Sequence, residues 1–163
     1  MSERTDKLLT DGLAEGYGGL KKPEKIKRSY FRGKSNYYNS PEGGHYHDEW
    51  FADDNGGGQE LTEIDGEKFT RLYGGGVIPV EELQKLGLTT KNVLSKLSVS
   101  INTLRNRTRL HTPSQLKFMD GLWLYTYSIL KQSEEVPLTV GYESIEYKGR
   151  EVFAHAHILS PIK

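Results

Sequence analysis

Two stretches in the second half of the chain alternate apolar residues with polar or small ones, which is the period of a β-strand. In residues 122–130 one face carries Trp123, Tyr125, Tyr127 and Ile129. In residues 152–159 one face carries Val152, Ala154, Ala156 and Ile158, and the other carries Phe153, His155, His157 and Leu159. Aromatic runs around residues 30 and 37, and a less regular alternation over residues 45–52, predict further strands in the first half.

A helical period replaces this alternation in the middle of the chain. Apolar residues spaced by four, four and three positions predict one buried stripe of a helix: Val93, Leu97, Ile101 and Leu104. Thr90 is the predicted cap of this helix. A shorter helix is predicted to begin at Pro79 and to stop at Gly87, because proline suits the first helical turn and glycine suits the end. Residues 3–15 predict another helix near the N-terminus.

Glycine and glutamate recur at the same offsets, 0, 2, 5 and 8, in two segments of the chain. The first set is Gly58, Glu60, Glu63 and Gly66, and the second set is Gly141, Glu143, Glu146 and Gly149. Each segment predicts a β-hairpin, with its turn at Asp65-Gly66 or at Lys148-Gly149. A type I′ turn needs a positive φ at both central residues, and glycine adopts this conformation without steric cost.

The order of sheet, helix and sheet predicts an α+β fold, in which a curved antiparallel sheet with two equivalent β-hairpins packs on a central helix. We expect residues 1–28 to form an N-terminal helix and a flexible linker, because residues 16–29 interrupt every periodicity with Gly and Pro. Residues 29–163 then form a single α+β domain, which is long enough to bury a substantial core.

Composition narrows the chemistry that the chain can perform. Cysteine is absent, which excludes disulfides, thiolate metal sites and cysteine nucleophiles. No apolar run approaches the roughly 20 residues of a membrane span, so we expect no membrane segment and a cytoplasmic location. Acidic and basic residues balance overall but form blocks: nine acids and no Lys or Arg in residues 42–67, and a basic excess in residues 1–34 and 68–117. Such blocks can steer a charged partner, or they can pair with one another on folding.

Spaced glycine, acidic and aromatic residues extend over most of the chain. The C-terminal part carries Asp120-Gly121, Trp123, Tyr125, Gly141-Tyr142-Glu143, Ile145, Tyr147, Gly149 and Val152-Phe153. Earlier positions of the same kind are Trp50, Gly56-Gly57-Gly58, Glu60, Asp65-Gly66 and Tyr73-Gly74. In these residues the chain resembles a bacterial family of small domains of unknown function that are sometimes fused to a helix-turn-helix segment. The resemblance covers residues 30–159 and implies a shared fold, but it implies no catalytic residue.

Four of the five histidines form two His-x-His pairs: His45/His47 and His155/His157. On a strand, the two imidazoles of such a pair share one face and lie about 7 Å apart along the chain, which suits a shared metal ion. If the two pairs meet, a neighbouring carboxylate could complete a site for Zn, Mn or Fe: Glu49, Asp53 or Asp54. A divalent metal is therefore the candidate cofactor. The alternative is that the pairs lie on separate faces of the sheet.

Glu60 and Glu143 occupy equivalent positions of the repeat. If both hairpins belong to one sheet, the two carboxylates could face each other across a concave surface, as an acid and base pair does. The alternative is a structural role, in which each glutamate accepts hydrogen bonds from the backbone of its own loop. Tyr125 and Tyr142 offer apolar area and a hydroxyl group, which suits a binding site. The predicted binding residues are thus Glu60, Glu143, Tyr125 and Tyr142.

These features predict a domain that binds a ligand or a partner on a sheet face lined by Tyr, His and Glu, with a small molecule or another protein as the partner. The residues do not decide whether the domain is also an enzyme. One alternative is a metal-dependent enzyme that uses the histidine pairs, and another is an interaction or inhibitor protein that uses the acidic block. Residues 83–109 fit a helix-turn-helix as well as one long helix, but the balanced charge disfavours nucleic-acid binding.

Overall fold

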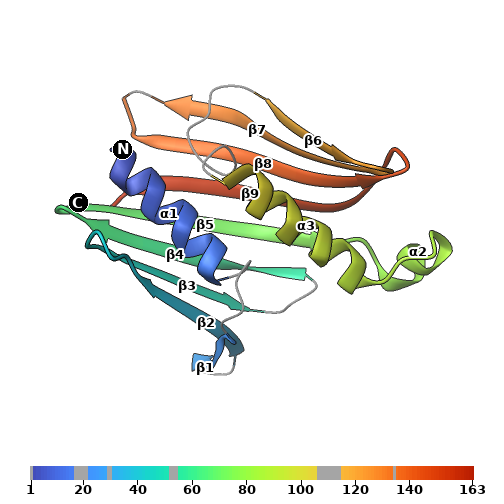
Figure 1. The fold of residues 1–163 in the computed structure, drawn as a ribbon, viewed down its shortest axis with the longest axis horizontal. Coiled ribbons are helices and arrows are strands. Elements are labelled where there is room, and N and C mark those ends of the chain that lie inside the picture. The colour runs from blue at the N-terminus through green and yellow to red at the C-terminus, as the bar shows by residue number, and fades with distance from the viewer. Residues whose placement is uncertain (1, 17–21, 29–30, 52–54, 106–114, 134) are drawn as a thin grey trace.

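The fold is a large antiparallel sheet with helices packed on one of its faces (Figure 1). The computed structural model describes residues 2–16, 22–28, 31–51, 55–105, 115–133 and 135–163. The helices are α1 (Glu3–Gly16), α2 (Val80–Lys85) and α3 (Thr90–Leu104). The strands are β1 (Glu24–Arg28), β2 (Phe31–Asn39), β3 (His45–Phe51), β4 (Asn55–Ile64), β5 (Glu67–Val77), β6 (Leu116–Asp120), β7 (Trp123–Ser133), β8 (Leu138–Tyr147) and β9 (Arg150–Pro161).

All nine strands belong to one sheet, with the order β1-β2-β3-β4-β5-β9-β8-β7-β6. The sheet does not close, because β1 and β6 remain at its two edges. The prediction of an α+β fold with an antiparallel sheet is confirmed at this level. None of the helices in the described parts of the chain is long and apolar enough to cross a membrane.

The strand order is symmetric about its centre. β5 and β9 pair with each other at the middle of the sheet, and we call this pairing the seam. Equivalent strands follow outward on both sides: β4 and β8, then β3 and β7, then β2 and β6. Helix α1 contacts β2, β3 and β4, and α3 contacts β7 and β8. The fold therefore consists of an N-terminal half (residues 3–77) and a C-terminal half (residues 80–161) in a twofold arrangement. Strand β1 has no counterpart in the C-terminal half and is an additional edge strand.

The β4–β5 and β8–β9 connections turn at the dipeptides that the repeat singles out. Asp65 and Gly66 have φ values of 54° and 80°, and Lys148 and Gly149 have φ values of 52° and 78°. A positive φ at both central residues gives a turn whose twist matches that of the flanking strands. Asp65 and Lys148 adopt this conformation despite their side chains, so the following glycine and the strand pairing determine the turn.

The apolar stripe of α3 is buried against the C-terminal half of the sheet. Its exposed fractions are 0% for Val93, 1% for Leu97, 2% for Ile101 and 3% for Leu104. The stripe packs in one cluster with four residues of β7, β8 and β9: Tyr125, Tyr127, Ile145 and Phe153. The helix is capped by Thr89 rather than Thr90, because the Thr89 hydroxyl accepts a hydrogen bond from the Asn92 backbone and the Asn92 side chain accepts one from the Thr89 backbone.

Helix α1 packs on the N-terminal half of the sheet. Two of its leucines join a second apolar cluster, whose members are Leu8, Leu9, Tyr46, Ile64 and Leu159. A Cβ atom at Gly12 would lie 2.2 Å from Cγ of Tyr46, so glycine is required for this close approach. Residues 24–28, which were expected in the linker, form β1 and pair with β2. Residues 17–21 of that expected linker lie outside the described residues.

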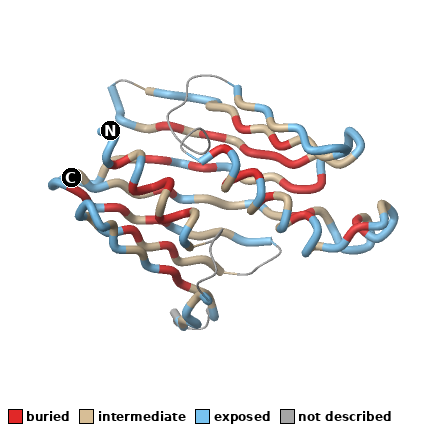
Figure 2. Tube along the Cα trace, viewed as in Figure 1, coloured by how far each residue is buried: buried red, intermediate tan, exposed pale blue. Residues whose placement is uncertain are grey.

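The basic N-terminal segment and the acidic block meet on the surface. Arg4 pairs with Asp65, and Lys7 Nζ lies 3.2 Å from Glu42 Oε1. Hydrogen bonds from Thr5, which has the larger effect, and from Ser2 lower the pKa of the Glu67 carboxyl. Exposed ion pairs of this kind add little to the stability of the fold. They do show that some acids of residues 42–67 are paired with basic residues of the same chain. Figure 2 shows that buried positions gather in the central strands beneath α1 and α3.

Candidate functional site

Three residues of the C-terminal half converge on the helix-covered face of the sheet: Glu143 of β8, and His155 and His157 of β9. Glu143 lies directly opposite His155 in the β8–β9 register. His157 is two residues farther along β9 and therefore points to the same face. Residues opposite each other on adjacent strands have Cβ atoms about 4.5–5.5 Å apart, which lets one carboxylate reach both imidazoles. We call these residues the Glu/His/His group.

The carboxylate of Glu143 lies between the two imidazoles. Its Oε1 atom is 3.3 Å from His155 Nδ1 and 3.2 Å from His157 Nε2. Its other oxygen, Oε2, accepts a hydrogen bond of 2.8 Å from the Tyr125 hydroxyl. One ligand atom from each of the three residues lies within 4.8 Å of the other two, so the group can hold a metal ion.

The Glu/His/His group is buried among aromatic rings. Glu143 is 0% exposed and His157 is 1% exposed. The ring centroids of Phe153 and Tyr73 lie 4.4 Å and 5.6 Å from that of His155. A buried carboxylate is costly unless a positive charge lies next to it. A cation bound beside Glu143 would offset this cost.

The Glu/His/His group has a counterpart in the N-terminal half, which becomes apparent when a one-residue shift in the strand register is allowed for. The β8–β9 register shifts between Ile145 and Glu146, whereas the β4–β5 register runs without interruption. Because of this β-bulge, Glu143 lies opposite His155, while the equivalent Glu60 lies opposite Arg71. By the same register His157 corresponds to Tyr73. The two halves thus place different side chains around equivalent glutamates.

Glu60 forms an internal ion pair in the N-terminal half. Arg71 binds both of its carboxylate oxygens, with Nη2 2.7 Å from Oε1. Both side chains are only 1% exposed. The Tyr46 hydroxyl donates a hydrogen bond of 2.7 Å to Oε1, as Tyr125 does to Glu143. Burial, followed by the charge of Glu60, raises the pKa of Tyr46 well above its usual value, so the phenol remains a donor.

Glu60 and Glu143 share the helix-covered face but do not face each other. Three strand spacings separate β4 from β8, which is roughly 14 Å across the sheet. The residue of β8 that lies in the row of Glu60 is Thr139, four positions from Glu143 and about 13 Å along the strand. The two carboxylates therefore cannot act as an acid and base pair on one substrate. Each has a separate partner within its own half.

The two histidine pairs lie on opposite faces of the sheet, which corrects the prediction of a metal ion shared by all four. Residues that lie opposite each other on adjacent strands point to the same face of the sheet. Asp48 lies opposite Glu60, Glu60 opposite Arg71, and Arg71 opposite Leu159. Leu159 is two residues from His157 in β9, so all of these side chains are on the face of His157. His45 and His47 are each an odd number of residues from Asp48, so they point to the opposite face of the sheet, which we call the outer face. There His45 Nδ1 lies 2.6 Å from Asn39 Oδ1, and His47 Nε2 lies 2.8 Å from Ser35 Oγ.

The other predicted site residues are also divided between the two faces of the sheet. Tyr125 joins the Glu/His/His group through its hydroxyl. Tyr142 precedes Glu143 in β8 and points to the opposite face, where its hydroxyl donates a hydrogen bond of 3.0 Å to Glu151. Glu49 lies on the outer face near His47. The remaining candidate ligands, Asp53 and Asp54, lie outside the described residues.

Sequence reasoning singled out Glu60 but missed the other buried polar residues of the N-terminal half. Besides the Glu60–Arg71 pair, Tyr73 donates a hydrogen bond of 2.9 Å to Asp48, which is 4% exposed. The Gly/Glu repeat could have pointed to Arg71. When the bulge is allowed for, Arg71 corresponds to His155, so both halves place a nitrogen-bearing side chain opposite the repeated glutamate. An ungapped repeat instead aligns position 71 with Ala154, which hides the relation.

Comparison of the chain with known proteins finds no matching family model, no similar curated protein and no similar solved structure. The geometry of the Glu/His/His group is therefore the basis for inferring function.

Proposed function

We propose that the protein binds a divalent transition metal ion, zinc by its ligand chemistry, through Glu143, His155 and His157. The observation that carries this proposal is the position of Glu143 Oε1, 3.3 Å and 3.2 Å from one nitrogen of each imidazole. In a tetrahedral zinc site with bonds of about 2.0–2.1 Å, neighbouring ligand atoms lie roughly 3.3 Å apart. A small movement of the side chains would thus bring all three atoms onto one ion.

The surroundings of the group also favour a metal. Metal-bound carboxylates and imidazoles are usually oriented by further hydrogen bonds, and the Tyr125 hydroxyl supplies one to Glu143 Oε2. A divalent cation would offset the cost of burying the Glu143 carboxylate. Two histidines and one glutamate leave the fourth tetrahedral position open, as in catalytic zinc sites. The bound ion would polarise an oxygen ligand or activate a water molecule at that position.

We therefore assign the domain a metal-dependent binding role, in which the open position takes a small molecule with an oxygen donor. The aromatic rings of Tyr73 and Tyr127 are close enough to His157 to line this position, with centroid distances of 6.1 Å and 6.3 Å. A Cβ atom at Gly141 would lie 2.4 Å from the Tyr127 hydroxyl oxygen, so the glycine allows that hydroxyl to lie beside the group.

Zinc titration of chelator-treated protein by isothermal calorimetry tests the proposal. We expect one equivalent to bind, and the affinity to fall below about pH 6, because protons compete with the metal for the imidazoles. At a free zinc concentration of 100 times Kd, binding should raise the free energy of unfolding by about 2.7 kcal/mol. Tyr125→Phe should weaken binding by about 10- to 100-fold, the usual effect of losing an outer hydrogen bond to a metal ligand.

The outer-face histidines provide a matched control. The double variant His155→Ala/His157→Ala should abolish the binding of one equivalent, and Glu143→Gln should weaken it strongly, whereas His45→Ala/His47→Ala should leave it unchanged. The proposal is wrong if wild-type protein takes up no zinc. It is equally wrong if the outer-face variant loses the metal and the inner-face variant retains it.

A further inference from the structure

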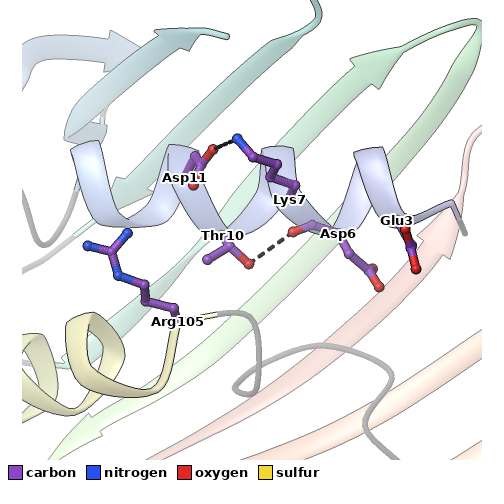
Figure 3. A pocket seen from close by; sticks show the side chains of 6 residues that line it. All are labelled: Glu3, Asp6, Lys7, Thr10, Asp11 and Arg105. Atoms are coloured by element: carbon purple, nitrogen blue, oxygen red, sulfur yellow. Dashed lines mark hydrogen bonds and ion pairs between the residues drawn. The ribbon is translucent and has the colours of Figure 1, made fainter. Parts of the chain in front are cut away.

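A cavity of about 660 Å³ lies between α1 and the C-terminal end of α3 (Figure 3). It is lined by Glu3, Asp6, Lys7, Thr10, Asp11 and Arg105. None of these residues belongs to the Glu/His/His group. The volume is within the range of about 300–1,000 Å³ that is typical of small-molecule sites.

The charges in this cavity are separated along its length. Glu3 and Asp6 place their carboxylates near the N-terminal end of α1, whereas the guanidinium of Arg105 lies near the other end (Figure 3). Lys7 and Asp11 form an ion pair of 2.7 Å and so cancel each other. Within the described parts of the chain, the side chains of Glu3 and Arg105 have no ion-pair partner. The cavity therefore has an acidic end and a basic end.

Asp6 is the more buried of the two acids at the acidic end. Its Oδ1 atom is buried and accepts no hydrogen bond from any residue that the structure describes. Burial raises the pKa of this carboxyl, and the charge of Glu3 adds to the effect. An ammonium group in the cavity, next to Asp6 and Glu3, would balance the negative charge of this end.

We propose that this cavity binds a zwitterionic small molecule, in which an ammonium group contacts Asp6 and Glu3 and a carboxylate pairs with Arg105. Guanidinium is well suited to the second contact, because its planar donors match a carboxylate in a bidentate pair. The lining residues of α1 extend from Glu3 to Asp11, about 12 Å of helix. This length accommodates a ligand whose two charges are separated by several carbon atoms, as in an ω-amino acid.

Calorimetry with chelator-treated full-length protein tests this site through a series of probes. The zwitterions are glycine, 4-aminobutanoate and 6-aminohexanoate, and the probes with a single kind of charge are 1,6-diaminohexane and hexanoate. We expect at least one ω-amino acid to bind with a stoichiometry of one, and both single-charge probes to bind at least tenfold more weakly. His155→Ala/His157→Ala should not change these affinities, which separates this site from the proposed metal site.

Variants of the two ends complete the experiment. Asp6→Asn and Arg105→Gln should each weaken the binding of the preferred ω-amino acid at least tenfold, with circular dichroism to check that each variant is folded. Glu15→Gln and Arg150→Gln, which change exposed charges elsewhere, should alter it less than twofold. Absence of binding by every zwitterion overturns the proposal. Equal binding of 1,6-diaminohexane also overturns it, because the cavity would then recognise cations alone.

Discussion

Replacing Arg71 with methionine is expected to lower the free energy of unfolding by about 3–5 kcal/mol, as is usual when one partner of a buried ion pair is removed. Arg71 and Glu60 are each 1% exposed, and the arginine binds both carboxylate oxygens. Methionine fills much of the same space, so the main effect is the charge of Glu60, left in the core without its cation. Urea unfolding followed by circular dichroism measures the change.

An exposed ion pair of similar composition serves as the control. Arg150 Nη2 lies 2.8 Å from Glu82 Oε2, with the arginine side chain 46% exposed. Arg150→Met should therefore change the free energy of unfolding by less than about 1 kcal/mol. The double variant Arg71→Met/Glu60→Leu should recover much of the loss, because it removes both buried charges. Equal effects of Arg71→Met and Arg150→Met would show that the buried pair is not a stabilising contact.

Leu97→Ala should lower the free energy of unfolding by about 2–5 kcal/mol, through lost transfer free energy and the cavity left behind. Leu97 is 1% exposed and lies in the middle of the α3 stripe. Its neighbours above and below, Val93 and Ile101, belong to the same cluster and are held by the sheet, so the core cannot collapse easily into the space. Thermal or urea unfolding of the two proteins provides the measurement.

Val99 provides a matched site on the other face of α3. It is 41% exposed, and Val99→Ala should change the free energy of unfolding by no more than about 0.5 kcal/mol. If Leu97→Ala has an effect as small as this, the stripe does not pack on the sheet as the structure shows. A loss confined to Leu97→Ala supports the packing of α3 over β7 and β8.

Local sequence features predicted the elements that depend on local physics. The turns at Asp65-Gly66 and Lys148-Gly149 follow from the conformational freedom of glycine, and the α3 stripe follows from the helical period. The same alternation put His155 and His157 on one face of a strand, as the structure has them. Only neighbouring residues of the chain are needed for such predictions.

The face on which each strand places its side chains depends on pairings that the sequence does not specify locally. His45 and His47 form a pair of the same kind as His155 and His157, yet the register through β4 and β5 places them on the outer face. The bulge after Ile145 changes which residue lies opposite Glu143, and it hid the correspondence of Arg71 with His155. Strand β1 escaped prediction because the Gly and Pro residues of segment 16–29 suggested a linker. Its sequence is mostly charged, as is common on edge strands.

The seam between the halves has a consequence for the order of folding. Strand pairs within each half join residues close in sequence, whereas the seam joins Phe69 to Pro161 and Val77 to Phe153, across about half of the chain. Closing such long loops is entropically unfavourable until both hairpins exist, so the seam should form last. Leu159→Ala at the seam should then act mainly by raising the unfolding rate in stopped-flow measurements, whereas Ile145→Val inside the β8–β9 hairpin should slow folding.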